Sequence, residues 1–195
     1  MAETLKQAQG TPAAEPPRNS RFWTRKNILA VTIIAFLFVL FIRVFVFETF
    51  LVRGDSMSPT IMSGQLVFVD KLAYIRSEPK RGDIVIAVPR VHPGRVVKRV
   101  IGLPGEWFSI ENGTIVIKDS RTDEGVKLDE KYLKLPYTPE VGTTRTNLDP
   151  EEYFALGDNR EVSIDSRELG PIDLWDVKGK VVGVFDFGTL RYKAF

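Results

Sequence analysis

Ser56 lies in a polar segment that could present a nucleophile. Residues 53–60 read Arg-Gly-Asp-Ser-Met-Ser-Pro-Thr. Ser58 followed by Pro59 is typical of a helix start, with Ser58 as the N-cap, and Gly54 permits a sharp bend. A hydroxyl at such a bend can face a cleft in which backbone N–H groups stabilise an oxyanion. The same residue types also form ordinary surface turns, so this segment alone leaves both interpretations open.

Lys98 is a candidate general base because it lies in an apolar strand pattern. Residues 96–101 read Val-Val-Lys-Arg-Val-Ile. Side chains alternate along a strand, so Lys98 shares a face with Val96 and Val100. Apolar neighbours lower the pKa of an amine, by up to about 3–5 units when it is fully buried, and the neutral amine can then act as a base. The neighbouring Arg99 shows that this strand tolerates charge, so a solvated or ion-paired Lys98 is the alternative.

Residues 157–170 form a dense polar stretch directly after an apolar run. Within it, Asp165 and Arg167 could pair, and Ser163 could orient a neighbouring group. A calcium site is one alternative, but Arg160 and Arg167 would repel a cation, and the spacing of an EF-hand is absent. A surface loop without a ligand is the other alternative.

The composition excludes several kinds of catalytic site. The chain has 195 residues, no cysteine and one histidine, His92. Thiol nucleophiles, disulfides, Cys-ligated metals and multi-His metal centres are therefore excluded, and we expect no metal and no cofactor. His92 is the only possible base of a Ser-His-Asp triad. It lies in a Val-His-Pro-Gly turn signature, where we expect it on the surface and poorly placed for catalysis. The net charge of +2 gives no argument for a nucleic-acid partner, and none is expected.

The N-terminal part of the chain has the pattern of a membrane anchor. Residues 28–47 form an apolar run whose only charge is Arg43, and twenty helical residues span about 30 Å, the thickness of a hydrocarbon core. Residues 1–27 carry five basic and two acidic groups, which predicts a disordered basic tail in the cytoplasm. A buried helix and a cleaved signal peptide are the alternatives. The sequence after the run lacks a small-residue cleavage site, which favours an uncleaved transmembrane anchor.

The rest of the chain, residues 48–195, is predicted to be one mostly β domain with antiparallel sheets or a barrel. Asn112 and Gly113 suit a two-residue hairpin turn. Residues 119–150 are polar and are expected to form a long surface excursion. Short runs rich in β-branched residues, bounded by turn residues, predict strands over residues 65–70, 83–88, 96–101, 107–110, 114–117, 153–156 and 180–187.

The order of these segments resembles the type I signal peptidases of bacteria and organelles. A basic tail and anchor precede Gly-Asp-Ser-Met-Ser-Pro-Thr at 54–60, Lys-Arg-Val-Ile-Gly-Leu-Pro-Gly-Glu at 98–106 and Gly-Asp-Asn-Arg-x-x-Ser-x-Asp-Ser-Arg-x-x-Gly at 157–170. The resemblance covers roughly residues 28–190. It implies the barrel-like catalytic domain of that family and a membrane-bound serine endopeptidase. Such an enzyme removes signal peptides from translocated preproteins after a small-x-small motif.

The resemblance also implies a role for each matching residue. Ser56 would be the nucleophile and Lys98 its general base, forming a dyad that passes through an acyl-enzyme. Ser163 would orient the lysine amine, and Gly157 would leave room near it. Asp165 and Arg167 would form a buried ion pair that shapes the site, and Met57 would pack beside the nucleophile. The shallow substrate pockets would be lined by Phe50, Val52 and Val97.

One position departs from the pattern of some relatives. They carry a serine two residues before the nucleophile, where this chain has Gly54. The oxyanion hole would then rely on backbone N–H groups.

Two other classes of protein compete with the peptidase: a membrane-tethered β domain without activity, and a self-cleaving Ser-Lys peptidase of the SOS-repressor type. The presence of both Ser56 and Lys98 argues against the first, and the membrane anchor argues against the second.

The expected partners are preprotein signal peptides and membrane lipid, with the protein translocation machinery as a further candidate. The catalytic domain is expected on the trans side of the membrane, in a periplasm, at a cell exterior or in a thylakoid lumen. The sequence fits a bacterial plasma membrane and a thylakoid membrane equally well.

Overall fold

The computed structural model describes residues 24–195, so most of the predicted basic tail, residues 1–27, lies outside the described residues. The chain divides into two compact units at the boundary between Leu40 and Phe41. The second unit contains every strand and all the chemistry-bearing segments.

The apolar run near the N-terminus forms one helix, α1, over Arg25–Phe45. It is long and apolar enough to cross a membrane, and none of its residues is buried within the protein. The helix starts three residues earlier than the predicted range 28–47 and ends two residues earlier. It starts earlier because Thr24 Oγ1 accepts a hydrogen bond from the Asn27 N–H at 3.4 Å, as an N-cap does. It ends earlier because Phe47 already pairs with Asp70 in the first sheet.

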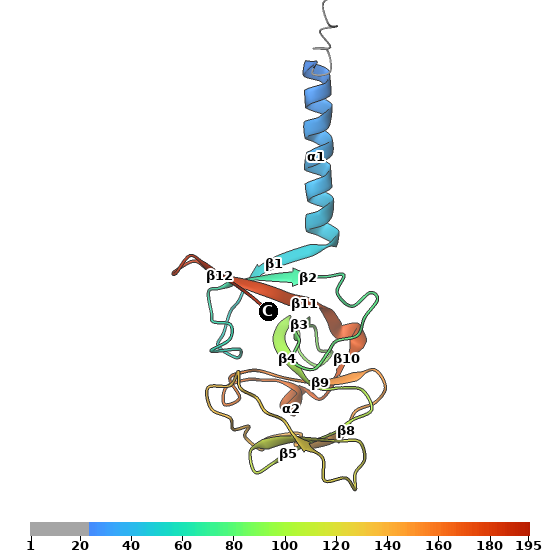
Figure 1. The fold of residues 1–195 in the computed structure, drawn as a ribbon, viewed down its shortest axis with the longest axis vertical. Helices are drawn as coiled ribbons and strands as arrows, with labels where there is room; N and C mark the ends of the chain where they lie inside the picture. The colour runs from blue at the N-terminus through green and yellow to red at the C-terminus, as the bar shows by residue number, and fades with distance from the viewer. Residues whose placement is uncertain (1–23) are drawn as a thin grey trace, which may run out of the picture. The chain divides into compact units, whose positions relative to one another are not determined.

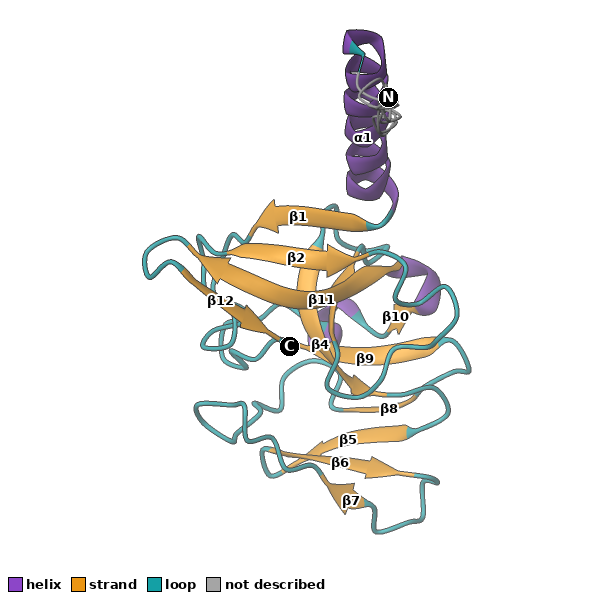
Figure 2. Cartoon of the chain, turned by 45° about the horizontal axis from the view of Figure 1, so that its top comes forward, coloured by secondary structure: helices purple, strands orange, loops and turns teal. Residues whose placement is uncertain are grey.

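A curved antiparallel sheet of eight strands forms the larger part of the β domain (Figures 1 and 2). Its order is β1-β2-β11-β3-β4-β9-β10, and β12 pairs with β11. The strand bounds are β1 Phe47–Leu51, β2 Leu66–Asp70, β3 Ile84–Ala87, β4 Val96–Gly102, β9 Glu152–Leu156, β10 Ile172–Asp173, β11 Val177–Asp186 and β12 Arg191–Ala194.

A second sheet of four strands lies at the opposite end of the β domain from β1 (Figure 2). Asn112 and Gly113 connect its two central strands with φ of 51° and 75°, as the predicted hairpin turn requires. The order is β7-β6-β5-β8, with β5 Trp107–Glu111, β6 Thr114–Lys118, β7 Val126–Lys127 and β8 Arg145–Asn147. Two short helices complete the domain, α2 Ser166–Leu169 and the 3₁₀ helix η1 Leu174–Asp176.

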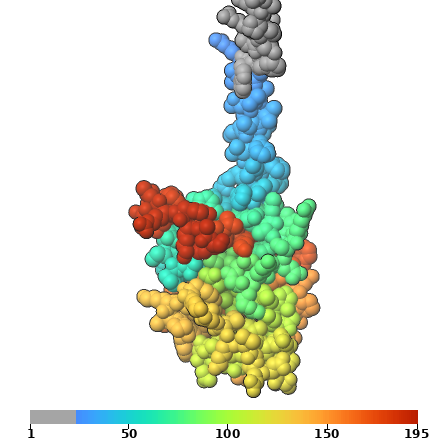
Figure 3. Space-filling view, viewed as in Figure 1, coloured from blue at the N-terminus to red at the C-terminus, as the bar shows by residue number. Residues whose placement is uncertain are grey.

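The mostly β, antiparallel fold with one N-terminal apolar helix agrees with the prediction. All seven predicted strands are present within a few residues of their expected bounds. The expectation of a surface excursion over residues 119–150 is wrong in part, because this segment contributes β7 and β8 and buries Leu133, Thr138 and Leu148. Figure 3 shows its exposed side as yellow and amber surface, and the exposed β12 in dark red.

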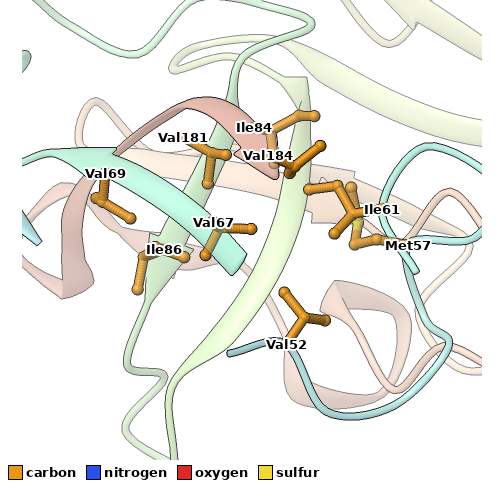
Figure 4. Close-up of a cluster of buried hydrophobic side chains, with 9 residues drawn as sticks. All are labelled: Val52, Met57, Ile61, Val67, Val69, Ile84, Ile86, Val181 and Val184. Atoms are coloured by element: carbon orange, nitrogen blue, oxygen red, sulfur yellow. The ribbon is translucent and has the colours of Figure 1, made fainter. Parts of the chain in front are cut away.

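Among the described residues, four clusters of buried apolar side chains pack against the sheets, and two of these cores are large. One core includes Phe108 and Phe154, whose rings stack with centroids 4.0 Å apart. The other lies against the large sheet (Figure 4) and includes Met57 and Ile61, close together and fully buried. Because Met57 directly follows Ser56, this second core anchors the chain beside the candidate nucleophile.

Candidate active site

Ser56 lies in a turn that leads away from β1. Gly54 has a φ of 94°, which glycine adopts without strain, so the predicted bend is present. The predicted helix starting at Pro59 is absent. The Ile61 N–H bonds to the Met57 carbonyl at 2.9 Å, which closes a single helical turn. The helix does not continue beyond this turn, because the Met57 and Ile61 side chains are buried in the core and the backbone must return to form β2 beside β1.

Lys98 lies in β4, and its side chain reaches the serine. Its Nζ donates a hydrogen bond to Ser56 Oγ at 3.0 Å. Only 4% of Lys98 is exposed, so it is not a solvated strand lysine. Burial lowers the pKa of Lys98 to about 8, with Asp165 and Asp158 opposing that shift and Arg167 adding to it.

Arg99 points to the other face of β4 and is also buried. Its Nε and Nη2 donate to the two oxygens of Asp158 at 2.8 and 2.6 Å, and its Nη1 donates to the Gly82 carbonyl at 2.8 Å. Such bidentate pairs hold their partners in a defined orientation. The role of Asp158 was missed in the sequence. The signal available was an arginine beside the candidate lysine and an unpaired aspartate in the Gly-Asp-Asn-Arg motif.

Asp165 and Arg167 form a buried ion pair that shapes the loop after β9. The carboxylate accepts from Arg167 Nε at 2.8 Å and Nη2 at 2.9 Å. It also accepts from the Gly157 N–H at 3.0 Å and caps α2. Arg167 Nη2 in turn donates to the Arg160 carbonyl at 2.7 Å. The calcium alternative fits poorly, because the buried carboxylates Asp158 and Asp165 are both engaged by arginines.

Gly157 and Ser163 pack closely beside the nucleophile turn. A Cβ at Gly157 would collide with Ser163 Oγ and with the Ser56 carbonyl oxygen. The glycine thus leaves room for these two groups, and the room for the lysine amine that the resemblance implied stays a prediction. Ser163 Oγ is buried and has no hydrogen-bond partner among the described residues. The expected bond between Ser163 and Lys98 is therefore not formed here.

Asn159 is a second residue that the sequence interpretation missed. Its N–H donates to the Ser56 carbonyl at 2.9 Å, and its Nδ2 donates to the Asp55 carbonyl at 3.2 Å. Asn159 therefore fastens the loop after β9 to the turn that carries the candidate nucleophile. The motif contains an amide side chain at this position, but its partner lies 104 residues away along the chain.

An open groove of about 850 Å³ runs past Ser56 and Lys98. Two unpaired strand edges border it. Among residues 24–195, β1 pairs only with β2, and residues 96–98 of β4 pair only with β3, since pairing with β9 begins at Arg99. The predicted pocket residues all line this groove: Phe50, Val52, Met57 and Val97.

His92 also lines the groove, from a turn closed by its N–H and the Pro89 carbonyl at 3.1 Å. The turn agrees with the prediction, but the side chain is half-buried rather than on the surface, and its Nδ1 is enclosed. In the described part of the chain, no hydrogen bond joins His92 to Ser56, whereas Lys98 Nζ donates to Ser56 Oγ. Within residues 24–195, no group of three or more His, Cys, Asp or Glu side chains is arranged to hold a metal.

Comparison with known proteins identifies the family. Residues 25–185 match the family described as signal peptidase, peptidase S26. The chain belongs to the type I signal peptidases. A signal peptidase I of Bacillus licheniformis is 38% identical over 89% of this chain and 94% of its own length. The signal peptidase I T of Bacillus subtilis strain 168 is 37% identical, with 80% of each chain covered.

A crystal structure of a signal peptidase I from Enterococcus faecalis V583 is 32% identical, with a TM-score of 0.46 over 54% of this chain and 97% of that one. Family membership makes this chain a serine peptidase and a hydrolase. Membership of this family favours the signal peptidase over the alternative of a self-cleaving, repressor-type peptidase.

Proposed function

We propose that this serine peptidase removes signal peptides from translocated preproteins, with Ser56 as nucleophile and Lys98 as general base. The observation that carries the proposal is the 3.0 Å contact between Ser56 Oγ and the Nζ of a buried lysine whose pKa falls to about 8. A base must reach the proton that it abstracts and must be neutral near the working pH. The 3.0 Å contact supports the first condition, and the lowered pKa of Lys98 supports the second, because it raises the fraction of neutral amine near neutral pH.

The reaction begins with neutral Lys98 taking the Ser56 proton while Oγ attacks the scissile carbonyl. The oxyanion is held by backbone N–H groups, including that of Ser56, because Gly54 offers no side chain. The protonated lysine then gives its proton to the departing amine of the mature chain, which leaves an acyl-enzyme on Ser56. In the second half, Lys98 activates a water that releases the signal peptide and restores the serine.

The remaining site residues shape this dyad. Ser163 Oγ is buried, has no hydrogen-bond partner within residues 24–195 and lies beside Gly157. We propose that it accepts a hydrogen bond from the lysine amine when the amine turns away from Ser56. Asp165 and Arg167 hold the loop that carries both residues. Met57 fixes the nucleophile turn through the core.

The substrate is proposed to lie extended in the groove, where a free strand edge can supply backbone hydrogen bonds. The apolar lining suits small side chains at the −1 and −3 positions, with Phe50, Val52 and Val97 forming the pocket walls. The lining of the groove therefore supports cleavage after a small-x-small motif.

The helix α1 is proposed to anchor the enzyme, with the basic flank in the cytoplasm and the β domain on the trans side. Signal peptides of translocated preproteins are held in the same membrane. Confining both partners to one surface raises their effective concentration. A direct contact with the translocation machinery would add to this effect.

The test replaces Ser56 with Ala and, separately, Lys98 with Ala or Arg, and measures preprotein cleavage by the purified full-length enzyme in lipid vesicles. We expect each change to lower kcat/KM by about a thousandfold or more, as removal of one member of a catalytic pair does. His92→Ala should leave cleavage unchanged. Full activity of either dyad variant would refute the dyad, and loss of activity in His92→Ala would restore the triad. A wild-type chain that cleaves no preprotein would favour the inactive relative.

A further inference from the structure

The segment between β6 and β9, residues 119–150, carries none of the sequence motifs, yet it reaches the region behind the dyad. We infer that two of its residues, Glu130 and Tyr132, are positioning residues for the reaction: they act on Ser56 and Lys98 through two buried arginines. The inference rests on the proposed function.

Glu130 binds the first arginine, Arg160. Nη1 of Arg160 donates to Glu130 Oε2 at 3.0 Å, and its Nη2 donates to Glu130 Oε1. The Arg160 side chain is 2% exposed and that of Glu130 is 9% exposed. Burial alone would lower the pKa of Arg160, but the Glu130 carboxylate raises it above its ordinary value. Thr138, from the same segment, also bonds to Arg160. The segment thus encloses this cation and supplies its counter-charge.

Tyr132 connects Glu130 to the second arginine. Its hydroxyl donates to Glu130, and its ring lies under Arg99, with the guanidinium carbon 4.0 Å from the ring centroid. A cation stacked on an aromatic face is held by the electrons of the ring, and the attraction grows when water is excluded. Arg99 is at the same time held by both oxygens of Asp158.

Each arginine leads to one half of the dyad. Arg160 Nε donates to the Gly157 carbonyl at 3.0 Å, and Gly157 packs against the Ser56 carbonyl oxygen. Arg99 directly follows Lys98 in β4. The contacts of Arg99 with Tyr132 and Asp158 therefore fix the strand from which the lysine projects. One segment therefore holds the backbone behind the nucleophile and the backbone behind the base.

The charges of this cluster balance. Arg99 and Arg160 are matched by Asp158 and Glu130, all with side chains at most 10% exposed. Removing a partner from a buried pair leaves a charge without compensation, which is strongly unfavourable. Arg160 would then need another anion, and Asp158 already interacts with it electrostatically. Recruitment of Asp158 would disturb Arg99, next to the lysine.

The test compares Glu130→Gln with Asp129→Asn in the full-length enzyme in vesicles, with kcat and KM for preprotein cleavage measured separately. Asp129 is a matched control, because it is the adjacent acid and its side chain is 71% exposed. We expect Glu130→Gln to lower kcat by about tenfold or more with KM changed less than about twofold, since small displacements of reacting groups slow the chemistry strongly. Glu130→Asp, which keeps the charge, should recover part of the loss.

Tyr132→Phe and Tyr132→Leu provide variants that do not create an unpaired charge. We expect the Phe variant, which keeps the ring over Arg99, to lose less kcat than the Leu variant. A wild-type kcat in a folded Glu130→Gln variant would overturn the inference. If Glu130→Gln does not fold, a wild-type kcat in both Tyr132 variants would overturn it. Wild type and Ser56→Ala are assayed alongside. An active wild type with an unaffected Glu130→Gln refutes this inference alone, whereas an inactive wild type refutes the proposed function and this inference together.

Discussion

The burial that would suit Lys98 to its proposed role as a base lowers the stability of the fold. Its ordinary pKa of 10.5 falls to about 8 in the folded protein because burial disfavours the charged amine. Below pH 8, both the folded and the unfolded chain hold the proton, and the cost is fully present, about 3 kcal/mol at 1.36 kcal/mol per pH unit. Between pH 8 and 10.5 the unfolded chain holds more protons than the folded one, so the free energy of unfolding rises with pH.

Replacing Lys98 with Met should therefore abolish cleavage and stabilise the protein. We expect the free energy of unfolding at pH 7 to rise by about 1–3 kcal/mol, because an apolar chain of similar length fills the site without a buried charge. Urea unfolding at a series of pH values checks this, and the gain should fade between pH 8 and 10.5. A variant less stable than wild type at pH 7 would show that Lys98 is not desolvated in solution.

The strands β1 and β4 create the groove by leaving backbone edges unpaired. β4 pairs with β3 along residues 96–99, but with β9 only from Arg99 onwards, so its first residues border the groove. Two valines of the wall differ in their packing. Val52 is 6% exposed and belongs to the core, whereas Val97 is only partly buried against it. Substrate selection and stability should therefore separate at these two positions.

We expect Val97→Ala to widen the groove with a loss of less than about 1 kcal/mol in the free energy of unfolding. The rate for a preprotein with Leu at −3 relative to Ala should rise by about fivefold or more, within the range that one or two methylene groups decide in an apolar pocket. Val52→Ala should instead cost about 2 kcal/mol of stability. Competitive cleavage of the two preproteins and urea unfolding measure both effects. Unchanged selectivity in Val97→Ala would remove this residue from the pocket.

At the scale of the whole molecule, most of the apolar helix α1 belongs to one compact unit, and the candidate active site belongs to the other. The end of α1 and the residue after it are bonded to the β domain, because Lys71 donates from Nζ to the Val44 carbonyl and from its N–H to the Val46 carbonyl, both at 2.9 Å. The boundary between the units lies before these contacts, at Phe41. Catalysis and anchoring are therefore expected to be separable at this point of the chain.

A chain shortened to residues 41–195 should fold and cleave a short soluble signal-peptide substrate with a kcat within about threefold of the full-length enzyme. On preproteins embedded in vesicles we expect a rate lower by about tenfold or more, since the enzyme loses its confinement to the substrate's surface. Circular dichroism and the two cleavage assays test this. Equal rates for both chains on vesicle-bound preprotein would contradict an anchoring role for α1.

Local patterns were enough to predict the larger elements. A twenty-residue apolar run and the alternation of β-branched residues depend only on neighbours in the chain, so α1 and the longer strands were found. The strands β7, β8, β10 and β12, of two to four residues, carry few alternating positions and were missed, although the four-residue β3 was found. The five-residue β1 was also missed, because its first residue, Phe47, was assigned to the apolar run. The helix expected at Pro59 was wrong because a local cap signal was overridden by the burial of Met57 and Ile61.

The sequence by itself determined the apolar helix α1, the antiparallel β class and the order along the chain of Ser56, Lys98 and the loop after β9. Only the tertiary structure decided that Lys98, 42 residues from Ser56, meets it at 3.0 Å in a buried site. It also decided that Arg99 and Arg160 are enclosed by Asp158 and Glu130. Desolvation and charge pairing depend on which segments pack together across the sheet, and neighbours along the chain do not specify that.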